Sequence, residues 1–474
     1  MKQIFLASTT FEVAGLAAGI DTGAYDSGDL PQVLGGGIDP HYPPVSERIL
    51  LLSDNARTLE VTTPLDEQPG MAALAQRFDR VLSLNAALAP LAPGSWAPRE
   101  EDAPILERLL RSAWDLGTGP LELIVESPQV NPAIALCRIF RTARVRVHAD
   151  GLMSFAPTRS HLPLHMGQRT TSLHYLPLAG TVRPRLLMEF GITPRPVPAA
   201  AFRSVLSEIA DAARAAVDAE TSGADGGSGC ALVVGQYLAA LGVLTTDEEE
   251  ALHVQMLEVA RARGAHTVLF KPHPAAPPAT TAILNERSAE LGVTLKVLAT
   301  PVIAEAVMDI VRPSLVVGGF STALATADFL FDIPVCAVGT ELILARLTPY
   351  QNSNRIPATI IDACAAEDAP AGFAAGSSLQ LLVDAVGYCM QPDVAALLRP
   401  QAEELLSDLP ATARRRWFRK RRIQALGLPG AQTPRVLTRT RANRWRALAT
   451  EAQRLHIRPL LQRARSSGRR IRLR

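Results

Sequence analysis

The sequence is poor in aromatic residues and in cysteine, and these shortages exclude several classes of protein. Of the 474 residues, 5% are aromatic and five are cysteine. The cysteines are odd in number, widely spaced and mostly set in apolar stretches, so we expect buried side chains in a reducing compartment rather than a disulfide framework or metal knuckle. A hydrophobic content of 47% excludes a collagen-like or disordered chain. The length predicts two domains or slightly more.

The sequence also has no long uninterrupted apolar run. The run at residues 4–7 is too short for the central region of an export signal, and polar residues follow it directly. Longer apolar stretches at residues 230–244 and 314–331 contain Gln236 and Asp328 and fall short of the about 18 residues needed to span a membrane. We therefore expect a cytoplasmic protein without a membrane-spanning helix.

Charge is distributed unevenly along the chain. Residues 411–474 carry 20 Arg or Lys and one acid, a net charge of +19, whereas the preceding 410 residues sum to −17. Trp417, Phe418 and Trp445 lie among these arginines and suit a membrane interface. The charge of this tail predicts an anionic partner: nucleic acid, the anionic inner leaflet of the membrane or an acidic polysaccharide. The alternative is a solvated tail that only neutralises the acidic remainder of the chain. Nucleic acid is disfavoured because no groove-reading motif is present.

Alternating strand and helix patterns on both sides of a Gly-rich segment predict two α/β domains. We place domains at residues 1–222 and 230–410, a linker at 223–229 and the basic, helical or flexible tail at 411–474. Strands are expected at 3–7, 48–52, 80–84, 121–125 and 144–148, then at 231–234, 266–270, 293–298, 315–317 and 334–338. Helices are expected at 282–291, 302–310 and 321–331, and Thr246 is expected to open another through a capping box with Glu249.

This alternation is typical of doubly wound parallel sheets. The predicted fold is thus two Rossmann-like domains that face a cleft between the carboxyl ends of their sheets, where such folds bind ligands. Three polar clusters in the sequence follow predicted strands and would line that cleft.

The first cluster contains Asp150 and Gly151, directly after the strand at 144–148. A carboxylate at the end of a strand is suited to act as a general base on a hydroxyl group. An Asp-Gly pair is also an ordinary turn signal, so both interpretations stay open at this point.

The second cluster is Lys271, Pro272, His273 and Pro274. Each proline restrains the preceding residue to extended geometry, so the side chains of Lys271 and His273 should point in fixed directions. A cation and a histidine at the end of a strand suit a phosphate leaving group that must be neutralised or protonated. The alternative is a proline-rich turn with a solvated histidine.

The third cluster is Gly318, Gly319, Phe320, Ser321 and Thr322. Glycines followed by hydroxyl residues at the start of a helix predict an anion site, where a phosphate approaches the free amides and the positive end of the helix dipole. Ser321 would also serve as an ordinary N-cap. Neither the Rossmann nor the Walker glycine pattern is present.

Several further polar residues have weaker signals. Gln236, with Tyr237, ends a strand and would line the cleft, whereas Glu305 would bind a ribose hydroxyl or lie on an exposed helix face. The run at 350–355 is rich in donors, although such runs are usually surface loops. The sequence shows no spacing typical of metal ligands or of a nucleophile motif.

Taken together, the segments around Asp150-Gly151, Lys271-Pro-His273-Pro and Gly318-Gly-Phe-Ser321-Thr322 resemble those of bacterial sialyltransferases, most closely the α-2,8-polysialyltransferase family. The resemblance runs from about residue 2 to 362 and also includes Gly235-Gln236-Tyr237 and the run at 350–355. It implies the GT-B fold and transfer of sialic acid from CMP-sialic acid to a glycan or glycolipid acceptor, with inversion and without a metal or cofactor.

The same resemblance assigns roles to individual residues. Asp150 would be the general base, His273 would stabilise or protonate the departing CMP phosphate, and Ser321 and Thr322 would hold that phosphate. The remaining donor-binding residues would be Gln236, Lys271, Pro274, Glu305, Gly318 and Gly319. Ala149 departs from the family pattern, which usually has a first acidic residue at this position.

Two other functions fit parts of the pattern. A teichoic-acid-type polymerase would use similar motifs on a CDP-alditol, and a non-enzymatic scaffold would bind polyanions or membrane through residues 411–474. The scaffold is disfavoured because it does not require a base, a histidine and an anion site on opposite lobes. If the product is an anionic polymer made at the membrane, the tail would bind that polymer or the inner leaflet, as a peripheral protein does.

Overall fold

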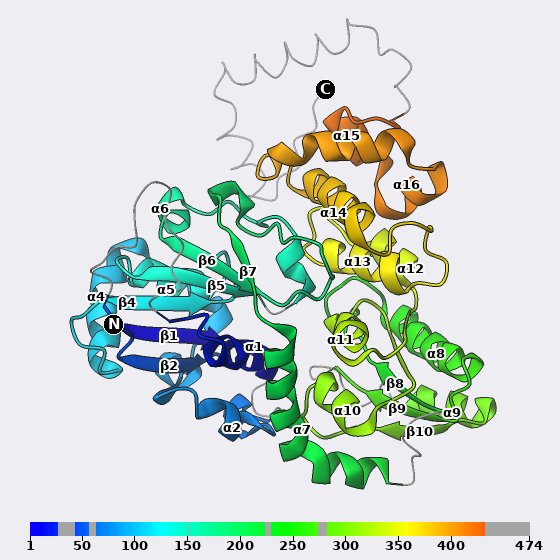
Figure 1. The fold of residues 1–474 in the computed structure, drawn as a ribbon, viewed down its shortest axis with the longest axis horizontal. Coiled ribbons are helices and arrows are strands. Elements are labelled where there is room, and N and C mark those ends of the chain that lie inside the picture. Colours follow the sequence, from blue (N-terminus) through cyan, green and yellow to red (C-terminus); the bar gives the residue numbers. More distant parts are fainter. Residues whose placement is uncertain (27–42, 56–62, 150, 223–228, 274–281, 432–474) are drawn as a thin grey trace, which may run out of the picture. The chain divides into compact units, whose positions relative to one another are not determined.

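A computed structural model of the chain describes residues 1–26, 43–55, 63–149, 151–222, 229–273 and 282–431. The chain divides into a large unit, Met1–Arg419, and a second unit that begins at Lys420 and whose described part contains α17 (Lys420–Leu426). The large unit contains two parallel sheets, each covered by helices (Figure 1).

The first sheet has seven parallel strands in the order β3-β2-β1-β4-β5-β6-β7. The strands are β1 (Lys2–Ala7), β2 (Glu47–Leu52), β3 (Arg80–Ser83), β4 (Leu121–Val125), β5 (Arg144–Ala149), β6 (Thr170–Tyr175) and β7 (Pro194–Pro196). The helices are α1 (Thr10–Asp21), α2 (Met71–Ala75), α3 (Leu84–Leu88), α4 (Ala103–Ala113), α5 (Ala133–Ile139), α6 (Leu164–Gly167) and α7 (Ala199–Thr221). Both faces of the central strands are buried, as a parallel sheet requires.

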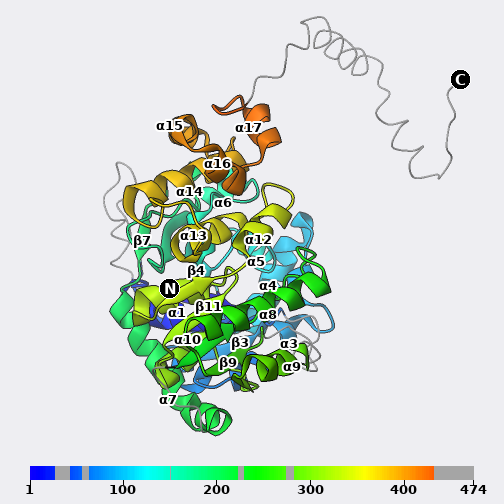
Figure 2. The same cartoon turned by 90° about the vertical axis from the view of Figure 1, so that its right-hand side faces the viewer.

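The second sheet has five parallel strands in the order β10-β9-β8-β11-β12. The strands are β8 (Cys230–Val234), β9 (Thr267–Lys271), β10 (Thr294–Val297), β11 (Leu315–Gly318) and β12 (Val335–Ala337). The helices are α8 (Thr246–Ala262), α9 (Ala282–Leu291), α10 (Ala304–Val311), α11 (Thr322–Phe331), α12 (Thr340–Arg346), α13 (Arg355–Ala365), α14 (Gly376–Met390), α15 (Arg399–Asp408) and α16 (Ala411–Trp417). In Figure 2, α13, α14 and α16 lie above strands β9 and β11 of this sheet.

The expected fold class, two doubly wound α/β lobes, is confirmed by these two sheets. Strands β6 and β7 were not predicted, because Ser172 and His174 interrupt the apolar pattern of β6, and β7 is a short edge strand with two prolines. The capping box of α8 lies one residue earlier than expected, since Thr245 is the N-cap and pairs with Glu248. The predicted linker falls largely on residues 223–228, which lie outside the described residues.

Polar contacts join the two lobes of the large unit. Arg185 of the first lobe forms two hydrogen bonds with the carboxylate of Asp384 on α14, at 2.6 and 2.7 Å. Near the end of α7, Glu220 accepts hydrogen bonds from the backbone N–H and the hydroxyl of Thr300, at 3.0 and 2.9 Å. Because Asp384 is buried and its carboxylate is bound in bidentate fashion, this contact has a defined geometry.

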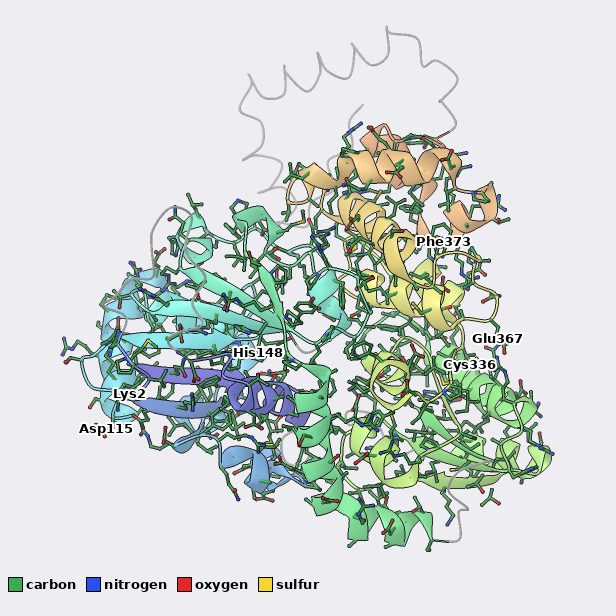
Figure 3. The ribbon with its side chains drawn as sticks, viewed as in Figure 1. Lys2, Asp115, His148, Cys336, Glu367 and Phe373 are labelled. Atoms are coloured by element: carbon green, nitrogen blue, oxygen red, sulfur yellow. The ribbon has the colours of Figure 1, made fainter. Side chains whose placement is uncertain are left out.

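The first residues of the predicted basic tail belong to the large unit instead. Asp362 on α13 is fully buried and accepts hydrogen bonds from Arg416 and from the indole N–H of Trp417. Trp417 is itself fully buried and packs edge-to-face on Phe373, whose position is labelled in Figure 3, with 5.1 Å between ring centroids. This difference from the prediction arises because Arg416 pairs with buried acid, which the charge count alone does not reveal.

Candidate active site

The strand order of the second sheet reverses between β8 and β11, and two of the predicted site residues meet there. Gln236 follows β8, and Gly319 follows β11. A Cβ atom on Gly319 would lie 3.0 Å from the side-chain Cδ and Oε1 of Gln236, so any larger residue at position 319 would have to displace the Gln236 side chain. Ligands of doubly wound sheets bind at such a reversal point.

The glycine turn leads directly into α11. Ser321 is the N-cap, and its Oγ accepts a hydrogen bond from the N–H of Ala323 at 3.2 Å. Thr322 is the first helical residue and is partly exposed. The expected N-cap is thus confirmed. The positive end of the helix dipole lies at this start of α11 and would favour a bound anion there.

Lys271 is the last residue of the neighbouring strand β9, and His273 follows that strand. Burial lowers the pKa of Lys271, and the carboxylate of Glu220 partly offsets this. His273 is an exposed residue, yet partial desolvation lowers the pKa of its imidazole, and the positive charge of Lys271 lowers it further. An anion bound near both groups would reverse the second effect and favour the protonated imidazole. Pro274 lies outside the described residues.

Glu305 does not lie on an exposed helix face. It is 4% exposed, and its Oε1 accepts a hydrogen bond from the hydroxyl of Thr326 at 2.8 Å. Thr326 lies one helical turn after Thr322 on α11. Glu305 is therefore a buried residue that contacts α11, the helix that begins at the predicted anion site. Its contact with a ribose hydroxyl stays a prediction.

The first lobe approaches this helix through the residue that follows Asp150. Asp150 itself lies outside the described residues. A Cβ atom on Gly151 would lie 3.2 Å from the Oγ1 atom of Thr322. The structure thus brings the segment with the predicted base and the start of α11 together, although they come from different lobes.

A small pocket of about 50 Å³ lies beside this contact. Its lining includes Glu126, Ala149, Gly151, Ser154, Ser353 and Met390. Glu126 directly follows β4, which pairs with β1 on one side and β5 on the other, and the strand order of the first sheet reverses between β1 and β4. The sequence analysis missed this carboxylate, although it follows a buried strand in the same way as Asp150.

Arg355 and His148 are both buried, and each contacts backbone carbonyl groups of the protein. Arg355, in the donor-rich run, is 1% exposed and donates hydrogen bonds to the carbonyl groups of Tyr350 and Leu347, at 3.0 and 2.6 Å. His148 on β5, which is labelled in Figure 3, is also buried. Its Nε2 lies 2.9 Å from the carbonyl oxygen of Leu6. Burial lowers the pKa of His148 to about 4, so its ring is neutral at pH 7.

Within the described ranges, no group of three or more His, Cys, Asp or Glu residues is arranged to hold a metal ion. Over the same part of the chain, no helix combines the length and apolarity needed to cross a membrane.

A family model described as alpha-2,8-polysialyltransferase (POLYST) matches residues 36–340. Comparison with curated proteins gives no match. Among solved structures, a sialyltransferase GT-B domain from Photobacterium damselae is 12% identical and has a TM-score of 0.38, with 76% of this chain and 95% of that chain covered. A glycosyltransferase from Rickettsia africae is 8% identical and has a TM-score of 0.36, with 90% and 98% covered. UDP-GlcNAc 2-epimerase from Methanocaldococcus jannaschii is 10% identical and has a TM-score of 0.40, with 71% and 83% covered.

Proposed function

Because the chain belongs to the alpha-2,8-polysialyltransferase family and is therefore a glycosyltransferase, we propose that it moves sialic acid from CMP-sialic acid to a hydroxyl group of a sialylated glycan. The observation that best supports this proposal is the approach of Gly151, the neighbour of the predicted base, to Thr322 at the start of α11. Transfer between a hydroxyl group and a phosphate ester requires those two groups in one place.

The proposed reaction is a single displacement with inversion. The acceptor oxygen forms a bond to the anomeric carbon of sialic acid, and the bond from that carbon to the phosphate oxygen of CMP breaks. The hydroxyl proton passes to Asp150, and His273 donates a proton or a hydrogen bond to the departing phosphate. Ser321, Thr322 and the first amides of α11 hold the phosphate.

The surroundings of His273 suit this role. Desolvation lowers the pKa of its imidazole, and the positive charge of Lys271 lowers it further. A donor phosphate near both side chains would offset the charge of Lys271 and raise the pKa of His273, which favours the protonated imidazole when the leaving group is present. Lys271 would then also stabilise the negative charge of the departing CMP.

The basic C-terminal segment supports a further part of this proposal. Residues 411–474 carry a net charge of +19, of which Arg416 is already paired within the large unit. We propose that the remaining charge binds an anionic surface, either the sialic acid polymer that the enzyme extends or the anionic inner leaflet of the membrane. Either partner keeps the enzyme near a growing chain and favours addition of more than one residue.

The test is release of CMP from CMP-sialic acid by the purified chain, with and without a sialylated acceptor. We expect release to depend on acceptor and to fall at least about 100-fold in Asp150→Ala and in His273→Ala, the usual scale for loss of an acid or base. His165→Ala, at an exposed histidine on α6, is the matched control and should keep wild-type activity. Product length on a gel reports polymerisation.

Two outcomes contradict the proposal. Turnover of CDP-glycerol without turnover of CMP-sialic acid would assign the chain to phosphopolymer synthesis. Inertness toward both donors, with retained binding to anionic vesicles through residues 411–474, would favour a scaffold.

A further inference from the structure

The loop that follows β8 contacts both parts of the proposed donor site. Its first residue, Gly235, donates a backbone hydrogen bond to the carbonyl of Lys271 at 2.9 Å. The next residue, Gln236, lies against Gly319. Residues 235–239 therefore connect the segment of His273 to the glycine turn before α11.

Two side chains of helix α8, one helical turn apart, accept hydrogen bonds from the backbone of this loop. The Nε2 atom of His253 accepts a hydrogen bond from the N–H of Gln236 at 2.8 Å, and the carboxylate of Glu249 accepts from the N–H groups of Leu238 and Ala239. His253 and Glu249 are 2% and 7% exposed. Burying such polar groups is favourable only when they are hydrogen-bonded, so these contacts fix the loop backbone.

Burial lowers the pKa of His253 to about 4. Its ring is therefore neutral at pH 7, and the Nε2 atom that faces Gln236 is free to accept a hydrogen bond.

Tyr237 lies between these anchored residues. Its ring is stacked on the imidazole of His273, with 5.3 Å between centroids and 10° between ring planes. The backbone on both sides of Tyr237 is held by α8, so the backbone position from which the tyrosine ring projects does not depend on His273.

We propose that Tyr237 is a positioning residue for His273: the loop held by α8 lays the tyrosine ring along the imidazole, fixes its orientation toward the donor and limits its contact with water. This inference rests on the proposed function of His273. It assigns no bond-making step to Tyr237, and the aromatic face rather than the hydroxyl group performs the role.

Lys271, in the same segment, is a charged group whose field reaches His273, and Glu220 at the end of α7 acts on Lys271 in turn. Removing the Tyr237 ring leaves these charges in place and exposes to water the face of the imidazole that the ring covers. The pKa of His273 should then rise, because desolvation is the larger cause of its lowering.

The test measures kinetics and the titration of His273 in the full-length chain. Tyr237→Phe keeps the ring and should retain near wild-type kcat. Tyr237→Ala should lower kcat at least tenfold, change the KM for CMP-sialic acid little, and raise the pKa of His273 seen by NMR, with the resonance identified by its absence in His273→Ala. Phe329→Ala, at an exposed aromatic residue on α11, is the control for loss of an aromatic side chain.

A double substitution separates positioning from a general loss of structure. If Tyr237 acts through His273, Tyr237→Ala should cause little further loss in the His273→Ala background, whereas independent effects would add. Full activity of Tyr237→Ala, or an unchanged pKa of His273, would overturn the inference while leaving the proposed function intact. Absence of sialyl transfer by the wild type would instead refute the proposed function, and the NMR titration would still decide whether Tyr237 controls His273.

Discussion

Gly151 and Thr322 come from opposite lobes, yet a Cβ atom on Gly151 would lie 3.2 Å from the Thr322 Oγ1 atom. That distance is shorter than ordinary van der Waals contact, so one neighbour must move to admit a methyl group. The contact leaves little room between the segment of the predicted base and the predicted phosphate site.

Replacement of Gly151 by alanine tests this contact. Overpacking of this kind costs about 1–3 kcal/mol, and the strain falls between the two lobes. We expect Gly151→Ala to lower kcat/KM about tenfold in the CMP-release assay while the chain stays folded by circular dichroism. Gly180→Ala is not a suitable control, because Gly180 has a positive φ of 60°. Gly15→Ala, on α1 with open space around its Cβ position, is the matched control.

Ser321 has two roles that separate by substitution. Loss of its N-cap hydrogen bond in Ser321→Ala should cost about 1 kcal/mol of unfolding free energy, and loss of the hydroxyl group should raise the KM for the donor. Ser321→Asn restores a capping oxygen and should recover most of the stability. Ser83→Ala removes the N-cap of α3 in the first lobe and should leave the donor KM unchanged. An unaltered donor KM in Ser321→Ala would contradict the phosphate role.

Glu126 is expected to contribute to transfer because it lines the pocket beside Gly151. Glu126→Gln keeps size and shape but removes the charge, and we expect acceptor-dependent CMP release to fall about tenfold. Ala149→Asp, added to Glu126→Gln, restores a carboxylate to the same pocket and should recover part of that loss. Glu67→Gln, at an exposed position, is the control. Wild-type rates in Glu126→Gln would show that the carboxylate is not used.

Much of the fold was predictable because its strands are continuous apolar runs bounded by turn residues. Strand β4 (Leu121–Val125) and helix α9 (Ala282–Leu291) lie where the pattern predicted them. The N-cap at Ser321 was predicted because a hydroxyl residue precedes an apolar helix. Strand β6 was missed since a polar layer, including His174, faces one side of it within the protein.

The site was less predictable because its contacts join distant segments. The approach of Gly151 to Thr322 and the stacking of Tyr237 on His273 depend on how strands order themselves in a sheet, which local pattern does not encode. The environment of Glu305 was ambiguous for the same reason, because its hydrogen-bond partner Thr326 lies on another helix. The roles predicted for Asp150 and Pro274 stay predictions, since both residues lie outside the described ranges.

The buried His148 predicts how stability depends on pH. Burial lowers its pKa from 6.5 to about 4 in the folded chain. The unfolded chain therefore binds more protons between these values, and the free energy of unfolding should decrease as the pH falls from about 6.5 to about 4, by on the order of 3 kcal/mol for this residue. His148→Gln should make the urea midpoint less dependent on pH in that window. The same slope in both proteins would contradict a buried neutral imidazole.

Arg416 and Asp362 predict the strength of the attachment of α16. Arg416 is the cation that pairs with fully buried Asp362, and its side chain is 7% exposed. Removal of one partner from a buried pair typically costs about 3–5 kcal/mol, because the other charge is left unpaired. Arg416→Ala should therefore lower the urea midpoint strongly, whereas Arg415→Ala, at the exposed neighbouring position, should not.

The same pair of variants separates the structural part of the basic segment from the part proposed to bind anions. Arg415→Ala should weaken binding to anionic vesicles or to sialic acid polymer without loss of stability, because this side chain is exposed. If Arg416→Ala instead left the urea midpoint unchanged, the contacts of Arg416 with Asp362 would not anchor α16. The stability of the large unit would then not depend on that ion pair. If both variants bound anions as the wild type does, the binding charge would lie beyond this helix, among the remaining arginines of the tail.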